Sequence, residues 1–317
     1  MAADSVLAQP SAVPDAFLRP DKGYCIACHA LPAALGRPGG DVGPALSGSR
    51  SRELGAGPLR QLIEDPMQAN ANTAMPPFGR HRILEAGEID SILRFLQALP
   101  EGEPAYAEPA ARDESVMQAE LDRGRALWTR KFKDKRSLSG CFPNGGRRTA
   151  ASYPQYDARV KRVVTLEIAI NQCLKVHHEP LLEPLEADMG AIVAYVRSLA
   201  AGQKIAVRVP PAAKPRLEEG RRLYFTRMGQ RNFACASCHV QSAGKRYDNM
   251  LLAASQGQAA RTYGTREGRA LTLQARMREC LERMGAAPFA PGSDELNHLE
   301  YYLSSLSNGQ PLDTARR

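Results

Sequence analysis

A five-residue motif that occurs twice limits what this chain can fold into more than any other feature. The sequence reads Cys-Ile-Ala-Cys-His at Cys25 and Cys-Ala-Ser-Cys-His at Cys235. The spacing C-x-x-C-H is the attachment signature of c-type haem, in which two thioether bonds hold the porphyrin and the adjacent histidine binds the iron. We therefore expect two covalently bound haem c groups. Their attachment residues are Cys25, Cys28 and His29 for the first, and Cys235, Cys238 and His239 for the second.

A redox-active cysteine pair and a structural zinc site are the alternative interpretations of a single such motif. A structural zinc ion needs four cysteine or histidine ligands, and the spacings around the two motifs do not supply them. The occurrence of the motif near the start of two separate repeats favours haem attachment.

The chain contains an internal repeat that ends each time in a similar amphipathic helix. These helices read EIDSILRFLQAL from Glu88, DMGAIVAYVRSL from Asp188 and ELNHLEYYLSSL from Glu295. Their apolar residues recur at helical spacing on one face, and an acidic residue opens each helix. The second and third repeats also begin alike, with GRALW from Gly124 and GRRLY from Gly220. We expect a mainly α fold of three cytochrome c-like helical domains in tandem.

Two proline-rich segments separate the repeats and are expected to be extended linkers. The expected division is a first cytochrome c domain at 1–103, a linker at 104–118, a second domain at 119–204, a linker at 205–215 and a third domain at 216–317.

The second axial ligand of each iron should come from a residue shortly before the last helix. In the first domain Met75 stands there in a proline-rich loop, and His81 and Met67 are the alternatives. In the third domain the equivalent position holds Cys280, which we expect to bind the iron as a thiolate. The competing sulfur ligands there are Met250, Met277 and Met284.

The middle domain lacks the residues that a c-type haem needs. Cys141 stands where the attachment motif should begin, but the second cysteine and the histidine are missing, while Cys173 remains in the axial position. We expect this domain to have lost its haem and to hold a Cys141–Cys173 disulfide as a replacement staple. Of the 7 cysteines, Cys280 is then the one without a covalent partner.

Charge and hydropathy exclude some classes of function. The net charge is +8 and the isoelectric point about 9.2, which favours anionic partners. The basic residues form no long run, so we expect no nucleic acid partner. No apolar stretch is long enough for a membrane span. Because c-type haem is attached on the oxidising side of a membrane, we expect a periplasmic protein whose signal peptide is not part of this sequence.

Several motifs together resemble the SoxXA cytochrome family. The first domain, with DVGPALSG and TAMPPFG, is similar to the SoxX subunit. The remainder, with YPQYD, VVTLEIAINQC, GQRNFACASCH and RMREC, is similar to a single-haem SoxA subunit. The chain thus looks like a fusion, natural or engineered, of two subunits that are normally separate.

The resemblance implies an L-cysteine S-thiosulfotransferase. Such proteins couple thiosulfate to a cysteine of the SoxYZ sulfur-carrier protein, and two electrons leave through the other haem to a soluble cytochrome c. The family's active-site cysteine, often a persulfide, corresponds to Cys280, and the arginine beside it corresponds to Arg276, with Arg278 a further candidate. Arginine suits a small dianion because its guanidinium stays charged.

Other functions remain open from the sequence. A plain dihaem electron carrier would use Cys280 only to set a reduction potential. A thiosulfate dehydrogenase would form tetrathionate without any carrier protein. A peroxidase is disfavoured by a cysteine in the axial position.

Overall fold

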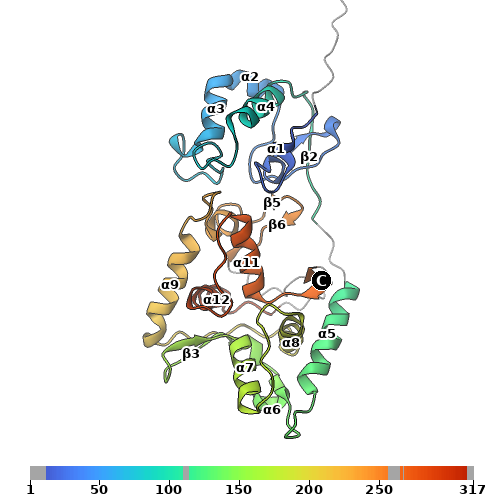
Figure 1. Ribbon diagram of the computed structural model, residues 1–317, viewed down its shortest axis with the longest axis vertical. Helices are drawn as coiled ribbons and strands as arrows, with labels where there is room; N and C mark the ends of the chain where they lie inside the picture. Colours follow the sequence, from blue (N-terminus) through green and yellow to red (C-terminus); the bar gives the residue numbers. More distant parts are fainter. Residues whose placement is uncertain (1–11, 110–113, 256–264, 267, 313–317) are drawn as a thin grey trace, which may run out of the picture. The chain divides into compact units, whose positions relative to one another are not determined.

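The computed structural model describes residues 12–109, 114–255, 265–266 and 268–312. It is mainly helical, and its described strands form two-stranded antiparallel ladders (Figure 1). The expectation of a mainly α fold is therefore confirmed. The chain divides into two compact units, one of residues 1–110 with 228–233 and 237–252, and one of residues 111–227, 234–236 and 253–317.

The described N-terminal part of the first unit contains short α-helices. They are α1 (Asp15–Leu18), α2 (Gly48–Leu54), α3 (Ala56–Glu64) and α4 (Ala86–Gln97), with 3₁₀ helices η1 (Cys25–Ala27), η2 (Ala33–Leu35) and η3 (Pro66–Gln68). Strand β1 (Leu31–Pro32) pairs with β2 (Pro104–Ala105), and β5 (Arg246–Tyr247) pairs with β6 (Met250–Leu251).

Helix α4 is the expected last helix of the first repeat, and it supplies much of the core of this unit. Glu85 and Glu88 form a capping box that satisfies backbone amides at its start. Its apolar face is buried as the periodicity predicted, and Phe95 packs edge-on against Phe17 of α1 with ring centroids 5.5 Å apart. Residues from α1, α3 and α4 share this core.

The second unit contains the longer helices and the remaining ladders. Its α-helices are α5 (Glu114–Thr129), α6 (Leu138–Cys141), α7 (Leu166–Val176), α8 (Ala187–Ser198), α9 (Lys214–Phe225), α11 (Leu273–Arg283) and α12 (Asp294–Leu306). Its 3₁₀ helices are η4 (Pro143–Gly146), η5 (Thr149–Ser152) and η6 (Pro211–Ala213). Strand β3 (Gln155–Asp157) pairs with β4 (Arg162–Val164), and β7 (Thr265–Arg266) pairs with β8 (Arg269–Ala270). The boundary between the two units falls inside α10 (Cys235–His239).

The first and last helices of the second and third repeats cross in the same way. Helix α5 packs on α8, and α9 packs on α12. At the first crossing a Cβ added to Gly124 would lie 2.0 Å from the carbonyl oxygen of Ala191, and at the second a Cβ on Gly220 would lie 2.1 Å from that of His298. Only glycine allows the helix backbones to approach so closely. The glycine that opens each repeat in the sequence is thus a packing residue.

The segment 205–215 is extended up to η6, as expected of a linker, but it is not free of the core. The side chains of Ile205 and Val207 are buried in the cluster that also contains Tyr301 of α12. The Ile205 amide donates a hydrogen bond to the backbone carbonyl of Gln310, and the Val207 amide donates one to the side-chain oxygen of Asn308. This segment therefore joins the second and third repeats within one compact unit. The other predicted linker includes residues 110–113, which lie outside the described residues.

Candidate functional site

The first attachment motif holds a histidine that is ready to bind a metal. His29 Nδ1 lies 2.7 Å from the carbonyl oxygen of Pro44, and burial lowers the pKa of His29. A carbonyl can only accept, so Nδ1 carries the proton and Nε2 keeps its lone pair for a ligand. A Cβ added to Gly43 would lie 2.3 Å from the ring, so the backbone of that loop lies directly against the imidazole and fixes it. These residues fit the proximal side of a c-type haem.

The two cysteines of this motif are poor candidates for thiol chemistry of their own. Burial raises the pKa of Cys25 and of Cys28 to about 12. A thiol that stays protonated at neutral pH is a weak nucleophile, which argues against a redox-active pair and is compatible with thioether attachment. In the described part of the chain, one group of side chains has metal-ligand spacing, namely Cys141, Cys173 and His177, and neither attachment motif belongs to it. The zinc alternative therefore gains no support.

The surroundings of the three axial candidates in the first unit differ. Met75 is partly buried on the same apolar cluster as Cys25, and its amide is held by the Thr73 hydroxyl at 3.0 Å. The Met67 sulfur accepts a hydrogen bond from the side-chain amide of Asn232, and His81 Nδ1 lies 2.6 Å from the carbonyl oxygen of Gln230. This arrangement favours Met75 over the two alternatives.

The second attachment motif lies on α10 and reaches two different clusters. Cys235 packs against a cluster of the second unit that also meets Met277 and Phe289. Within the first unit, Cys238 and Cys28 both border the small cluster of Ala27, Tyr247 and Leu252. Burial and the neighbouring Cys28 contribute to a raised pKa of Tyr247. One cysteine from each attachment motif therefore lies at the same apolar cluster.

Cys280 lies on α11, whose N-terminus is capped by the Thr272 hydroxyl accepting from the Ala275 amide. Burial raises the pKa of the Cys280 thiol, and the positive charges of Arg283 and Arg276 oppose that rise. Cys280 is thus a partly buried thiol whose thiolate form is favoured by nearby guanidinium groups, against the effect of burial.

The two candidate arginines of α11 have different partners. Arg276 precedes Cys280 by one helical turn, and its Nη1 donates to Glu279 Oε2 at 3.2 Å while about a third of its side chain, 34%, stays exposed. Arg278 donates to the carbonyl of Phe289, which fixes the loop between α11 and α12. Arg276 is therefore near the thiol and reachable, whereas Arg278 holds the backbone. Glu279 is not among the residues expected from the sequence, although its i,i+3 spacing from Arg276 is a detectable signal.

The competing sulfur ligands of the last repeat lie in three places. Met277 borders the cluster of Cys235, Met284 is buried at the C-terminal end of α11, and Met250 belongs to β6 of the first unit.

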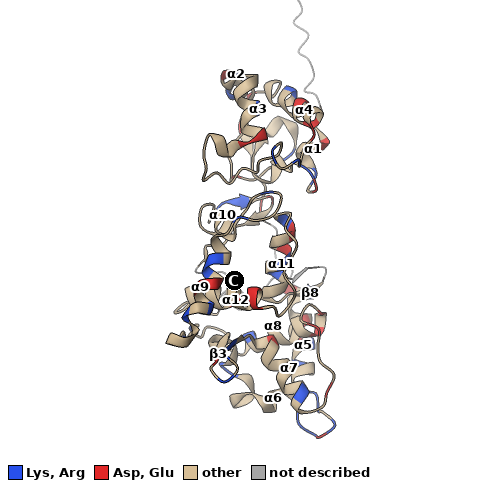
Figure 2. Cartoon of the chain, turned by 60° about the vertical axis from the view of Figure 1, so that its left-hand side comes forward, with Lys and Arg blue, Asp and Glu red and all other residues tan. Residues whose placement is uncertain are grey.

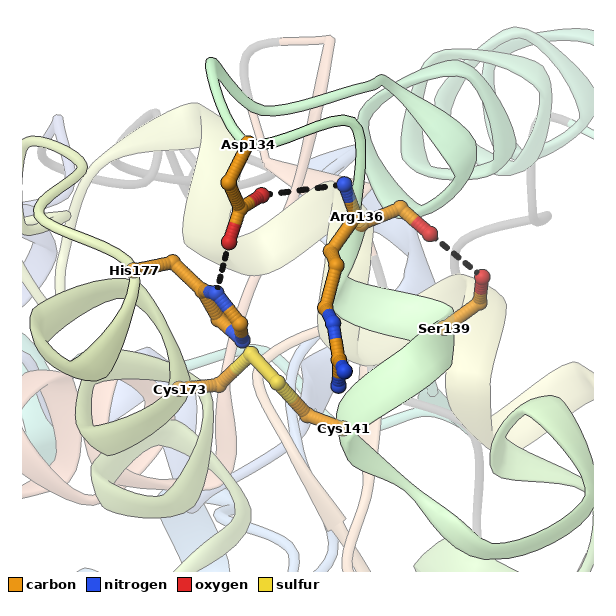
Figure 3. The surroundings of a disulfide bond; sticks show 7 residues. Asp134, Arg136, Ser139, Cys141, Cys173 and His177 are labelled. Carbon is orange, nitrogen blue, oxygen red and sulfur yellow. Dashed lines mark hydrogen bonds and ion pairs between the residues drawn. A yellow bond between two sulfur atoms is a disulfide. The ribbon is translucent and has the colours of Figure 1, made fainter.

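The middle repeat contains the expected disulfide. Cys141 at the end of α6 and Cys173 on α7 are joined, with Cα atoms 6.1 Å apart (Figure 3). The interior beside it is filled by rings, because Trp128 packs on Phe142 with centroids 5.0 Å apart and donates to the Gly145 carbonyl at 2.9 Å. Protein side chains therefore fill the interior next to the disulfide.

The chain is similar to a known protein family and to individual proteins of known name. A sequence profile described as "SoxA/TsdA, cytochrome c domain" matches residues 123–205 and 219–312. The L-cysteine S-thiosulfotransferase subunit SoxA of Chlorobaculum tepidum is 33% identical over 195 residues, which are 61% of this chain and 68% of that protein. The protein of the same name from Allochromatium vinosum is 33% identical over 198 residues, covering 61% and 70%.

Among solved structures, the crystal structure of SoxXA from P. pantotrophus is similar with a TM-score of 0.56. The match has 24% sequence identity and covers 63% of this chain and 82% of that one, so it concerns the fold alone. In the part of the chain that the structure describes, no helix has the length and apolarity needed to cross a membrane.

Proposed function

Because the chain belongs to the SoxXA cytochrome family, through its SoxA/TsdA-type cytochrome c segments, we propose that it is an L-cysteine S-thiosulfotransferase of the periplasm. The reaction joins thiosulfate to a cysteine thiol of a SoxYZ-like sulfur-carrier protein. A new S–S bond forms between the carrier cysteine and the outer sulfur of thiosulfate, one proton leaves the carrier thiol, and two electrons are released. A soluble cytochrome c receives these electrons.

The proposal includes two covalently bound haem c groups. Cys25, Cys28 and His29 would hold the first with Met75, and Cys235, Cys238 and His239 would hold the second with Cys280. When bound, these groups supply one-electron acceptors at two potentials, higher for histidine–methionine and lower for histidine–thiolate ligation. Cys28 and Cys238 border one apolar cluster, which supports direct electron transfer between the two attachment sites.

The observation that carries the proposal is the environment of Cys280. The thiol is partly buried, and the charges of Arg283 and Arg276 oppose the rise in its pKa that burial causes. A thiolate flanked by guanidinium groups suits reaction with a dianion such as thiosulfate, because the cations offset the repulsion between two negative sulfur species. We assign Cys280 as the reactive sulfur and Arg276 as the residue that binds thiosulfate.

Arg278 takes a different part in this account. Its guanidinium is bound to the Phe289 carbonyl, so it orients the loop that follows the reactive helix. We propose that it is a positioning residue and that it does not contact thiosulfate.

We also propose that the three repeats are cytochrome c-like domains in tandem, with the haem of the middle one lost. The disulfide and the packed pair Trp128 and Phe142 in that repeat support this view. The SoxX-like part at 1–103 would then be fused to a SoxA-like part, and a covalent link of this kind keeps the two redox sites at a high effective concentration.

The test is a thiosulfate assay with the holoprotein, a carrier protein with one reactive cysteine and oxidised cytochrome c. We expect cytochrome c reduction that requires the carrier, and a carrier mass raised by one thiosulfate. Cys280→Ser should abolish both signals and Arg276→Gln should raise the thiosulfate KM, whereas Arg125→Gln, an exposed control on α5, should change neither. Full activity of Cys280→Ser would contradict its assignment as the reactive sulfur. No thiosulfate on the carrier with the wild type would indicate a plain electron carrier, and tetrathionate formation without the carrier protein would indicate a thiosulfate dehydrogenase.

A further inference from the structure

The disulfide of the middle repeat has an acid–base pair beside it. His177 places a ring nitrogen within 4.8 Å of the sulfurs of both Cys141 and Cys173. The carboxylate of Asp134 contacts the imidazole of His177, and its Oδ2 lies 2.6 Å from His177 Nδ1. Figure 3 shows the carboxylate, the imidazole and the sulfur pair in succession. A disulfide that served only as a staple would need neither group.

The carboxylate is held so that it fixes the tautomer of the imidazole. The Arg136 amide donates to Asp134 Oδ1 at 2.9 Å, and this bond together with the one from His177 lowers the pKa of Asp134. An ionised carboxylate only accepts, so the His177 proton resides on Nδ1 and Nε2 is basic. Phe132 packs against the imidazole with centroids 5.3 Å apart, and only 12% of the His177 side chain is exposed. The ring is therefore immobilised next to the sulfurs.

The two cysteine residues differ in exposure. Cys141 is an exposed residue, whereas Cys173 is 6% exposed within the core of the second unit. A nucleophile from solution therefore has better access to Cys141 than to Cys173, and a His177 ring nitrogen lies within 4.8 Å of the Cys173 sulfur that would leave.

The loop in front of the disulfide is strongly basic. The segment 130–136 between α5 and α6 contains five exposed cations and one acid, and Figure 2 shows it largely in the colour of lysine and arginine. The cations are Arg130, Lys131, Lys133, Lys135 and Arg136. In Figure 3 the Arg136 side chain extends toward the disulfide. Such a loop attracts negatively charged partners and repels cations.

We propose that Cys141–Cys173 is a site of thiol–disulfide exchange for an anionic thiol, with His177 as the acid–base group and Asp134 as its positioning residue. The incoming sulfur forms a bond to the Cys141 sulfur, and the electron pair of the old S–S bond leaves with the Cys173 sulfur. His177 takes the proton of the incoming thiol and gives it to the Cys173 thiolate. The products are a mixed disulfide on Cys141 and a free thiol on Cys173, and no external oxidant or reductant is required.

The chemistry is independent of haem, and it can be followed in the holoprotein by site-resolved mass spectrometry. The protein is incubated with glutathione, quenched with an alkylating agent and digested, and the mixed disulfide on Cys141 is quantified against time. We expect glutathionylation of Cys141 with alkylation of Cys173. A mixed disulfide on Cys173, or no reaction of the folded protein, would overturn the proposal.

Variants at two neighbouring histidines separate catalysis from a general structural effect. His177→Asn should slow the exchange at least about tenfold, since positioned acid–base groups contribute factors of 10² or more. His178→Asn is the matched control, because His178 is exposed and its positive φ of 54° is tolerated by asparagine. It should react as the wild type does. Equal rates for all three proteins would show that His177 has no part in the exchange.

The role of Asp134 is tested by comparing its substitution in the wild type and in His177→Asn. Asp134→Asn should slow the exchange in the wild type, because an amide that donates to Nδ1 moves the imidazole proton to Nε2. The same substitution should have no further effect in His177→Asn. Independent, additive losses would contradict a positioning role.

The preference for an anionic thiol can be measured in the wild-type protein, so this test does not require that any variant folds correctly. At equal thiolate concentration, glutathione should react several-fold faster than cysteamine, and Lys133→Gln with Lys135→Gln should reduce this ratio. A ratio of one would contradict the proposed anion preference. A second experiment uses an acidic peptide with one cysteine as the thiol. If this peptide reacts faster than glutathione, the partner is a protein thiol. If it reacts more slowly, the partner is a small thiol.

Discussion

Gly124 and Ala191 meet so closely that a Cβ added to the glycine would lie 2.0 Å from the alanine carbonyl oxygen. Gly220 has the same relation to His298, at 2.1 Å. Each contact is between the first and the last helix of a repeat, α5 with α8 and α9 with α12. The second unit therefore depends on two equivalent points at which helix backbones touch.

Gly220→Ala should lower the free energy of unfolding by about 1–3 kcal/mol, because the methyl group forces α9 away from α12. This loss exceeds the gain of up to about 1 kcal/mol that alanine brings to a helix interior. Chemical denaturation followed by circular dichroism measures the change. Gly140→Ala is the control, since a Cβ there meets nothing within 4 Å, and it should be neutral or stabilising. Unchanged stability of Gly220→Ala would mean that the helices separate at little cost.

A buried cluster of charged side chains predicts how stability depends on pH. Glu300 and Glu167 are both 6% exposed, and Arg197 is 7% exposed. Burial, and then the nearby Glu167, raise the pKa of Glu300 well above its usual value, against the opposing effects of the Gln274 side chain and Arg197. A carboxyl whose pKa is higher in the folded protein contributes stability below its unfolded pKa and loses it as the pH rises.

Glu300→Gln should therefore stabilise the protein at pH 7 and have little effect near pH 4. Each unit by which the folded-state pKa is raised corresponds to about 1.4 kcal/mol. Denaturant midpoints at the two pH values measure this difference, and exposed Glu183→Gln is the control. A variant that is less stable than the wild type at pH 7 would contradict the expected sign.

The contact of Gly43 with His29 predicts a local effect at the first proposed haem site. A methyl group at position 43 would lie 2.3 Å from the imidazole, so Gly43→Ala should displace the ring that would bind the iron. We expect a changed spectrum and reduction potential of one haem, with the other unaffected and both still attached. Gly57→Ala, where a Cβ meets nothing within 4 Å, serves for comparison. Identical spectra for Gly43→Ala and the wild type would argue against His29 as the ligand.

The disulfide should stabilise the second unit without taking part in the thiosulfate reaction. Its cysteines are separated by 32 positions in the sequence, and a loop of that size is worth about 3–4 kcal/mol in the chain-entropy account. Replacing both cysteines by serine should lower the unfolding free energy by this amount while thiosulfate turnover persists below the melting temperature. Loss of turnover in a folded variant would connect the disulfide to the main reaction.

Local signals predicted part of the fold and of the site. The helices α4, α8 and α12 follow from apolar periodicity, and the disulfide follows from the position that Cys173 shares with Cys280 across the repeats. The glycines of the repeated GRALW and GRRLY segments were visible in the sequence, but their function as contact points appears only once the opposing carbonyls are placed.

Long-range contacts explain what the sequence did not reveal. Asp134 and His177 come from separate turns of the chain and meet where α6 and α7 are joined by the disulfide. Ile205 and Val207 lie in a proline-rich stretch that reads as a linker, although their side chains enter the core. Arg278 resembles its neighbour Arg276 in sequence, and only the structure shows their different partners, the Phe289 carbonyl for Arg278 and Glu279 for Arg276.

The intact mass of the holoprotein under denaturing conditions, with and without alkylation and reduction, tests the central claim most directly. The account predicts the polypeptide with two haems, one alkylatable sulfur at Cys280, and two further thiols, Cys141 and Cys173, that appear on reduction. Additional sulfur on Cys280 after incubation with thiosulfate would identify it as the reacting atom. A single haem, or Cys280 bound in a disulfide, would contradict the account.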